Sequence, residues 1–343
     1  LVDATGRDVV PDTASPSASA KTPADIRAAY NLNGTSSGGR TVAIVDAYGY
    51  PNAERDLGVY RQQFGLPACS TANGCLTIVN QSGGTSLPRF NAGWAAEQGL
   101  DLDAVSATCP DCKILLVQAS SASIANLGAG VVTASKVPGV VAISNSYGGG
   151  DLSDQTYGGS YNHPGIAVTA STGDNGYQGA SFPASSDYVT AVGGTSLTKA
   201  AGTTRGWTET VWTGAGSGCS TVNPALAAAA AFGTGCAKRA MADVSAVADP
   251  QTGLAVYAPT TKTSSTWAQY GGTSLSSPII AAVYALSGNT SGSANAIPYG
   301  HAGSLFDVTS GSNGSCPTTQ WCHARTGWDG PTGLGTPNGV GAF

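Results

Sequence analysis

Short apolar runs alternate along the chain with longer segments in which apolar residues recur at helical spacing. An apolar run bounded by turn residues is typical of a strand that is buried on both faces of a parallel sheet. Such strands are expected at 41–47, 113–117, 139–144, 165–170 and 188–192. Helices are expected at 22–30, 52–64, 91–108, 123–136 and 275–286. The alternation predicts an α/β fold, with a mainly parallel β-sheet and helices on both faces.

The most apolar of these helices is preceded by Ser274, which follows two glycines and a threonine. The segment 275–286 is apolar nearly all round, which predicts a buried helix that stops at Gly288. Ser274 then lies at a helix N-terminus, where free N–H groups and the helix dipole favour developing negative charge. Ser274 is therefore either a helix N-cap or a nucleophile.

A nucleophilic serine needs a base, and histidine is the usual one. The chain has three histidines, His163, His301 and His323. His163 precedes a proline in an expected loop, and the other two lie in a turn-rich tail. This placement does not favour a Ser-His-Asp triad.

Glu97 and Asp101 offer a different base. They are four residues apart in the expected helix 91–108 and so share one helical face. One interpretation is a solvated polar face. The apolar neighbours Trp94 and Leu100 instead favour a partly buried helix. Two buried carboxylates cannot both ionise easily and can share a proton, so the pair would serve as a general base in acid, where imidazole is protonated.

A third carboxylate, Asp174, lies in the sequence Gly-Asp-Asn-Gly at 173–176, shortly after the expected strand 165–170. Functional groups of parallel sheets gather at the carboxyl ends of strands. The same four residues also suit a simple Asx turn. At acid pH a protonated Asp174 would be able to donate a hydrogen bond to an oxyanion.

Charged residues make up 10% of the 343 residues, which is well below the usual ~25%. The net charge of −5 argues against a nucleic-acid partner. No apolar run is long enough to span a bilayer, so no membrane partner is expected. Few carboxylates also means few native ion pairs to lose in acid, which favours acid tolerance.

Eight cysteines fall into four local pairs, which predicts disulfides and an oxidising compartment. The expected bridges are Cys69–Cys75, Cys109–Cys112, Cys219–Cys236 and Cys316–Cys322. The CxxC at 109–112 also suits a redox or metal site. A structural bridge is favoured there, because the chain has no second CxxC and no histidine pair at zinc spacing.

Residues 1–21 are rich in Ser, Ala, Pro and Thr and are expected to form an N-terminal arm or processing remnant. Residues 22–343 contain no internal repeat and no clear linker, so we expect a single domain. No signal peptide stands at residue 1, so the chain is expected to be a mature, processed form.

Taken together, these motifs resemble the sedolisin family of serine-carboxyl peptidases, over nearly the whole chain from about Thr22. The resemblance rests on Gly272-Thr273-Ser274 followed by Pro278, on Glu97-x-x-Leu100-Asp101, on Gly173-Asp174-x-Gly176, and on tail segments near Asp307 and Asp329. It implies a subtilisin-like fold. It also implies that Ser274 is the nucleophile and Glu97 the general base and acid. Asp101 would orient Glu97 and share its proton, and Asp174 would be the oxyanion-hole acid.

The resemblance implies a calcium site in the tail, at about 305–335. Its ligands would be the side chains of Asp307 and Asp329 and the backbone carbonyls of Val308, Arg325 and Gly327. Calcium binds six or more hard oxygens, which glycine-rich loops are able to supply. Without the resemblance, the two aspartates would be read as turn residues.

The resemblance further implies a substrate-binding segment at the end of the expected strand 139–144. Its residues are Ser144, Ser146, Tyr147 and Gly148. Such a segment would pair with the substrate backbone as an added strand. Tyr147 would either wall a specificity pocket or pack in the interior.

The resulting expectation is a secreted, extracellular, acid-acting endopeptidase with a Ser-Glu-Asp triad, a hydrolase that binds Ca²⁺ and acts as a monomer. Its partners would be a peptide or protein substrate and its own N-terminal propeptide, which is removed. One alternative is a tripeptidyl-peptidase of the same family, which needs a cleft blocked at one end and an anion for the substrate amine. The other is a non-catalytic binding protein on this scaffold.

Overall fold

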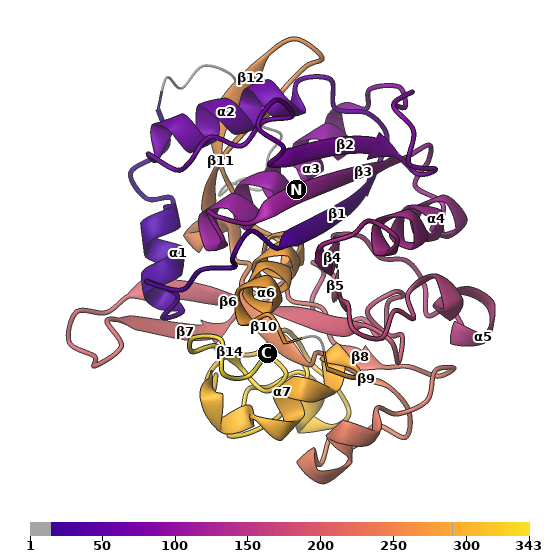
Figure 1. The fold of residues 1–343 in the computed structure, drawn as a ribbon. Coiled ribbons are helices and arrows are strands. Elements are labelled where there is room, and N and C mark those ends of the chain that lie inside the picture. The colour runs from indigo at the N-terminus through magenta and orange to yellow at the C-terminus, as the bar shows by residue number, and fades with distance from the viewer. Residues whose placement is uncertain (1–14, 290) are drawn as a thin grey trace.

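The computed structural model describes residues 15–289 and 291–343, so residues 1–14 of the expected arm lie outside the described residues. An eight-stranded sheet forms the centre of the fold, in the order β10-β6-β5-β4-β1-β3-β2, with β7 paired to β6 (Figure 1). All neighbours are parallel except β6 and β7. The strands are β1 (Thr41–Ala47), β2 (Leu76–Asn80), β3 (Lys113–Ala119), β4 (Val140–Asn145), β5 (Ala167–Ser171), β6 (Thr190–Lys199), β7 (Trp207–Val211) and β10 (Val244–Val247).

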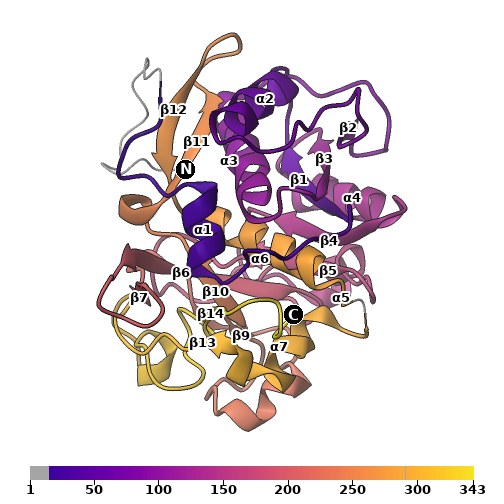
Figure 2. The ribbon, with the colours of Figure 1, turned by 60° about the vertical axis from the view of Figure 1, so that its left-hand side comes forward.

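Helices cover both faces of this sheet, as the sequence predicts. They are α1 (Pro23–Ala29), α2 (Ala53–Gln63), α3 (Ala92–Thr108), α4 (Ile124–Ser135), α5 (Asp154–Tyr157), α6 (Thr273–Ser287) and α7 (Ile297–Gly300). Val42 and Ile44 of β1 share one apolar core with α3 and α6, whereas Val45 faces the opposite core, which includes α4. Figure 2 shows α3 and α6 on the same side of the sheet. The mainly parallel α/β prediction is therefore confirmed.

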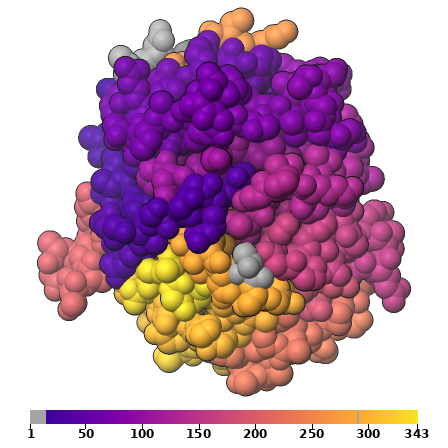
Figure 3. Space-filling view, in the orientation of Figure 1, coloured from indigo at the N-terminus to yellow at the C-terminus, as the bar shows by residue number. Residues whose placement is uncertain are grey.

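The remaining elements are short pairs and turns. The paired strands are β8 (Gly218–Cys219) with β9 (Ala240–Met241), β11 (Leu254–Pro259) with β12 (Ser265–Tyr270), and β13 (Leu305–Phe306) with β14 (Thr336–Pro337). Short 3-10 turns lie at Gly158–Ser160, Ala227–Phe232, Pro250–Thr252, Ala294–Ala296, Ala302–Ser304 and Thr319–Trp321. The loop between β6 and β7 projects from the body of the molecule, at the left of Figure 3.

Local sequence explains where several helices begin and end. Thr22 and Asp25 form a capping box at the start of α1, and the side chain of Asn91 accepts a hydrogen bond from Trp94 N at the start of α3. Gly288 ends α6 in the left-handed conformation that favours glycine (φ 69°). Several strands were not expected from the sequence. They are β2, β7 and β10 of the central sheet and the pairs β8–β9, β11–β12 and β13–β14.

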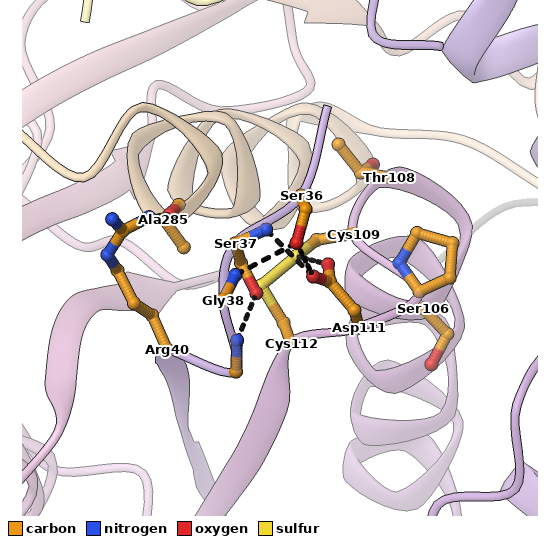
Figure 4. Close-up of a disulfide and its surroundings, with 12 residues drawn as sticks. Ser36, Ser37, Gly38, Arg40, Ser106, Thr108, Cys109, Asp111, Cys112 and Ala285 are labelled. Carbon is orange, nitrogen blue, oxygen red and sulfur yellow. Dashed lines mark hydrogen bonds between the residues drawn. A yellow bond between two sulfur atoms is a disulfide. The ribbon is translucent and has the colours of Figure 1, made fainter. Parts of the chain in front are cut away.

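All four predicted disulfides are confirmed. The Cys109–Cys112 bridge lies just after α3 and is shown in Figure 4. Beside it, Asp111 accepts hydrogen bonds from Ser36 Oγ (2.6 Å) and Ser37 N (2.8 Å). Arg40, on the same loop, donates to the carbonyl of Ala285 in α6 (2.9 Å). The loop 36–40 therefore links the C-terminal ends of α3 and α6.

No helix among the described residues combines the length and the apolar character that crossing a membrane would require.

Candidate active site

Ser274 is the second residue of α6 and is nearly buried, with 8% of its surface exposed. The N-cap of this helix is Gly272, so the interpretation of Ser274 as the N-cap is wrong. Gly272 has a φ of 100°, which L-residues rarely adopt. Ser274 therefore lies in the first turn of α6, where the positive end of the helix dipole favours negative charge.

Asp174 lies in the loop after β5 and contacts the start of α6. Its Oδ1 accepts hydrogen bonds from Thr273 N (2.7 Å) and Thr273 Oγ1 (2.9 Å). A Cβ atom added to Gly272 would lie 2.8 Å from Oδ2 of Asp174. Glycine at position 272 thus provides both the backbone conformation and the room for this carboxyl group. Because Oδ1 is already bonded to Thr273, Oδ2 remains for another partner.

Glu97 is brought to Ser274 by the packing of α3 against α6. It is 8% exposed, and burial raises its pKa to about 7. A hydrogen bond between the Glu97 and Ser274 side chains opposes that rise in pKa, and the charge of Asp174 adds to it. These interactions bring together three of the four predicted catalytic residues, Glu97, Ser274 and Asp174.

Asp101 lies one helical turn after Glu97 and is fully buried. Ser146 Oγ donates a hydrogen bond to Asp101 Oδ1 (3.0 Å) and lies 3.2 Å from the carbonyl oxygen of Ser274. Burial raises the pKa of Asp101 well above its ordinary value, and the charges of Asp46 and Glu97 raise it further. The interpretation of Glu97 and Asp101 as a solvated face is therefore wrong.

Asp46 is a buried carboxyl that sequence reasoning missed. It is the second-last residue of β1. Neither of its carboxyl oxygens has a hydrogen-bond partner among the described residues. Asp46 and Asp101 interact strongly enough to shift each other's pKa, and two buried carboxyl groups this close cannot both ionise easily. Burial raises the pKa of Asp46, and the charge of Glu97 adds to this. Its place at the carboxyl end of a strand was the available signal.

The residues of the predicted substrate-binding segment lie in different environments. Ser144 is fully buried, and its hydroxyl lies 3.0 Å from Ser277 Oγ of α6, so its side chain does not reach a substrate. Tyr147 packs in the core, where its hydroxyl donates to Asn145 Oδ1 (2.7 Å). The hydroxyl of Ser146 belongs to the carboxyl cluster. Gly148 is exposed and lines a cavity.

That cavity lies beside Asp174 and has a volume of about 380 Å³. It is lined by residues 148–150, 171–176, 178–181 and 216. Tyr147 is not among the lining residues, so it packs in the interior rather than walling this pocket. The cavity therefore opens next to the carboxyl group that faces Ser274.

The tail aspartates have an environment that fits a cation. Asp329 is fully buried; its Oδ1 accepts from Thr332 N (2.9 Å), whereas Oδ2 has only a long contact with Arg325 N (3.4 Å). Asp307 Oδ2 accepts from Gly327 N (2.9 Å). Burial raises the pKa of Asp329 to about 7, and the nearby charge of Asp307 contributes. A weakly bonded, buried carboxylate oxygen beside a second carboxylate fits the hard-oxygen chemistry of calcium.

A zinc site at the CxxC is ruled out by the disulfide. Among the described residues, one group of three His, Cys, Asp or Glu side chains lies close enough together to share a metal ion. It consists of Cys109, Asp111 and Cys112. Both cysteines are bonded to each other, so neither offers a thiolate.

The histidines take no part in the reaction centre. His163 Nε2 lies 2.9 Å from the carbonyl of Ser160, and burial lowers the pKa of this imidazole. His301 follows α7, and the backbone of His323 forms an antiparallel β-bridge with Ser312 in the tail. Carboxyl groups, not an imidazole, therefore face Ser274.

Several known peptidases are similar in sequence to this chain. The chain is 30% identical to kumamolisin from Bacillus sp. (strain MN-32), over 94% of this chain and 62% of kumamolisin. This similarity supports the sedolisin family. No profile of a known protein family matches the sequence. Part of the chain, 20% of its length, is 42% identical to tripeptidyl-peptidase sed1 from Aspergillus fumigatus, of which it covers 12%.

A solved structure of Pseudomonas sedolisin, a serine-carboxyl proteinase complexed with pseudo-iodotyrostatin, has the same fold. The TM-score is 0.78 at 24% identity, over 93% of this chain and 95% of that one. The subtilisin-like fold expected for a sedolisin is thereby confirmed. The chain spans about three fifths of the length of kumamolisin and a much smaller part of sed1.

Proposed function

We propose that the chain is the catalytic unit of a secreted, acid-acting serine-carboxyl endopeptidase, with a catalytic domain at 22–343. Ser274, Glu97 and Asp101 form its triad, and Asp174 serves in the oxyanion hole. The observation that carries this proposal is that the buried carboxyl group of Glu97 interacts with the Ser274 side chain at the start of α6.

The proposed reaction begins when Ser274 Oγ attacks the carbonyl carbon of the peptide bond. The hydroxyl proton passes to Glu97, and the carbonyl oxygen becomes an oxyanion. That oxyanion accepts hydrogen bonds from the protonated Oδ2 of Asp174 and from the N–H of Ser274. Glu97 then gives its proton to the leaving amine as the C–N bond breaks. Water hydrolyses the acyl-enzyme by the same proton transfers in reverse.

The buried carboxyls around Glu97 support this chemistry in acid. Glu97, Asp101 and Asp46 cannot all ionise in one buried cluster, so protons are shared among them. A negative charge on one carboxylate is then stabilised by hydrogen bonds from its protonated neighbours. Because these carboxyls titrate as a group, the carboxylate formed in the first ionisation of the cluster is the base that accepts a proton from Ser274 in acid.

Calcium is the cofactor we propose for the tail. The side chains of Asp307 and Asp329, with the carbonyls of Val308, Arg325 and Gly327, would hold it. Bound calcium would neutralise the two carboxylates and stabilise the loops that carry them. None of these residues takes part in the proposed proton transfers.

The four disulfides support secretion, because such bridges persist in oxidising compartments. A peptide or protein is the proposed substrate, and a removed N-terminal propeptide and a monomeric state complete the proposal. The similarity to sed1, named a tripeptidyl-peptidase, favours a second candidate activity, the release of tripeptides from a free N-terminus.

Digestion of one denatured protein across pH 3–7, followed by mass spectrometry, tests these activities. We expect internal cleavage at acid pH, which Ser274→Ala and Glu97→Gln abolish. Ser276→Ala and Asp103→Asn are matched controls on the same helices. Ser276 donates to the carbonyl of Thr273, and Asp103 accepts from Tyr257 N, so neither faces the reaction centre. Activity retained without Ser274 or Glu97 would reject the triad, and a product map of tripeptides alone would identify the second activity.

A further inference from the structure

The loop 173–177, which carries Asp174, is paired with the segment 214–217 between β7 and β8. The pairing consists of a hydrogen bond from Gly176 N to the carbonyl of Gly214 (2.9 Å), one from Gly216 N to the carbonyl of Gly173 (2.8 Å), and a parallel β-bridge between Tyr177 and Ser217. The position of Asp174 at the start of α6 therefore depends on where the segment 214–217 lies.

Asn313, in the C-terminal tail, lies where these two segments meet, and it is 5% exposed. Its backbone carbonyl accepts a hydrogen bond from Tyr177 N (3.0 Å). Its Nδ2 donates to the carbonyl of Ala215 (2.6 Å) and to Ser217 Oγ (2.8 Å). One residue of the tail thus contacts the loop 173–177 with its backbone and the segment 214–217 with its side chain.

The contact between Asn313 and the loop leaves no free space. A Cβ atom added to Gly176, two residues after Asp174, would lie 2.5 Å from the carbonyl oxygen of Asn313. Groups packed this closely move together, because the interior has no room for independent displacement. A shift of Asn313 would therefore displace the loop that carries Asp174.

Asn313 is itself held firmly in the tail. Its N–H donates to the carbonyl of Cys322 (3.0 Å), and the Cys316–Cys322 disulfide closes the turn that follows Asn313. The hydroxyl of Ser217 donates to the carbonyl of Trp321 (2.6 Å), so the same part of the tail holds the segment 214–217 a second time. The tail is therefore an anchor for the loop 173–177.

The chemistry of the two acceptors calls for an amide at this position. Both hydrogens of Nδ2 are used, one on a carbonyl oxygen and one on a hydroxyl that already donates elsewhere. An apolar side chain would leave the buried carbonyl of Ala215 without this donor, which is unfavourable.

We propose that Asn313 is a positioning residue of the oxyanion hole, which fixes the loop 173–177 from the tail and thereby the carboxyl group of Asp174. The proposal rests on the proposed function of Asp174. Groups of a reaction centre must be held within about 0.5 Å of their productive positions. A misplacement of about 1 Å, caused by a change far from the chemistry, costs about a hundredfold in rate.

The test is a double-mutant cycle of Asn313→Ala and Asp174→Ala, in which kcat and KM are measured for one peptide at acid pH. Asn313→Ala should lower kcat by about ten- to a hundredfold and leave KM nearly unchanged, because a displaced Asp174 stabilises the oxyanion less well. In the Asp174→Ala background the same change should alter kcat by less than about twofold, because the group that Asn313 positions is absent.

Asn313→Asp keeps the shape of the side chain and tests the two donors. A protonated carboxyl group retains one donor, whereas an ionised one presents only acceptors to the carbonyl of Ala215. Across pH 3–7, the kcat of this variant relative to the unaltered protein should therefore fall as the pH rises. The relative kcat of Asn313→Ala should show no such fall.

Asn295→Ala is the matched control. Asn295 is buried, and its Nδ2 likewise donates to two acceptors, the carbonyls of Asp187 (2.7 Å) and Val189 (3.4 Å). Neither acceptor belongs to the loop 173–177 or to the segment 214–217. This variant should lose stability and keep the kcat of the unaltered protein.

An equal fold loss of kcat from Asn313→Ala with and without Asp174 would overturn the proposal, because the two residues would then act independently. An unchanged kcat in Asn313→Ala would also overturn it. So would loss of the folded state in both Asn313 variants, measured by circular dichroism, since the residue would then serve folding. Failure of the proposed function looks different: Asp174→Ala would keep full turnover, or the unaltered protein would cleave no peptide.

Discussion

The hydroxyl of Ser146 donates a hydrogen bond to the carboxyl group of Asp101 over 3.0 Å. The same hydroxyl lies 3.2 Å from the carbonyl oxygen of Ser274. Ser146 follows β4, Asp101 lies on α3, and Ser274 lies on α6. One side chain thus contacts both helices of the proposed reaction centre from the end of the central sheet.

Replacement of Ser146 by alanine should therefore impair catalysis more than binding. The lost hydrogen bond lowers the pKa of Asp101 in the intact protein, so its removal should raise that pKa further. We expect kcat to fall by about tenfold, which corresponds to one hydrogen bond to a charged group, with KM nearly unchanged. The pH–rate profile should shift to higher pH.

Ser144→Ala is the control for this variant, because Ser144 bonds Ser277 instead of a carboxyl group. It should lower the free energy of unfolding by about 1 kcal/mol and leave the pH–rate profile unchanged. Equal profiles in the two variants would contradict the role given to Ser146.

Asp46→Asn should move the pH–rate profile in the opposite direction. The charge of Asp46 raises the pKa of Asp101, so its removal should lower that pKa and displace the profile toward acid. Asp103→Asn, a change at a buried carboxyl on the other side of α3, should alter stability alone. If both variants gave the profile of the unaltered protein, Asp46 would have no part in the proton sharing.

The stability of the fold should decrease as the pH rises from about 4.3 toward 7. Burial raises the pKa of Glu97 to about 7, whereas an unfolded glutamate has a pKa of about 4.3. Between these values the folded state binds more protons, so the free energy of unfolding falls with pH, by on the order of 3 kcal/mol for this group. Asp101 and Asp46 act in the same direction.

Urea unfolding at pH 4.5, 5.5 and 7 measures this dependence. Glu97→Gln should flatten the curve, because glutamine does not titrate. A free energy of unfolding that rose over this range would contradict the burial of protonated carboxyls.

Asp174→Ala should reduce kcat by about a hundred- to a thousandfold, which is the usual effect of losing one oxyanion donor. Asp174→Asn should restore much of this loss. Asparagine keeps an oxygen that accepts from Thr273 and offers N–H donors at any pH. The asparagine variant should therefore be more active than the alanine variant. An alanine variant with full turnover would remove Asp174 from the oxyanion hole.

Chelation of calcium should lower the melting temperature. A site occupied at a hundred times its Kd adds about 2.7 kcal/mol to the stability of the folded state. Asp329→Asn should melt at the same temperature with and without calcium. Asp151→Asn should keep the full calcium response, because Asp151 bonds Ser220 and Thr221 outside the tail. If the melting temperature of the unaltered protein changed with neither calcium nor chelator, the proposed calcium site would be rejected.

Local sequence by itself determined much of the architecture. The apolar runs at 41–47 and 113–117 are strands because they fit a sheet buried on both faces, and Thr22 and Gly288 cap helices through their own backbone and side-chain chemistry. The bridges join cysteines at most 17 residues apart, so short spacing was sufficient to pair them.

Only the tertiary structure decided which polar groups meet. Glu97, Asp46 and Ser274 come from three distant segments, and whether a carboxylate is solvated or buried depends on what packs over it. Ser144 and Ser146 look alike in the sequence, yet one hydroxyl faces Ser277 and the other faces Asp101. Side-chain spacing assigns a residue to a face of its own element, but the neighbour across that face is set by long-range packing.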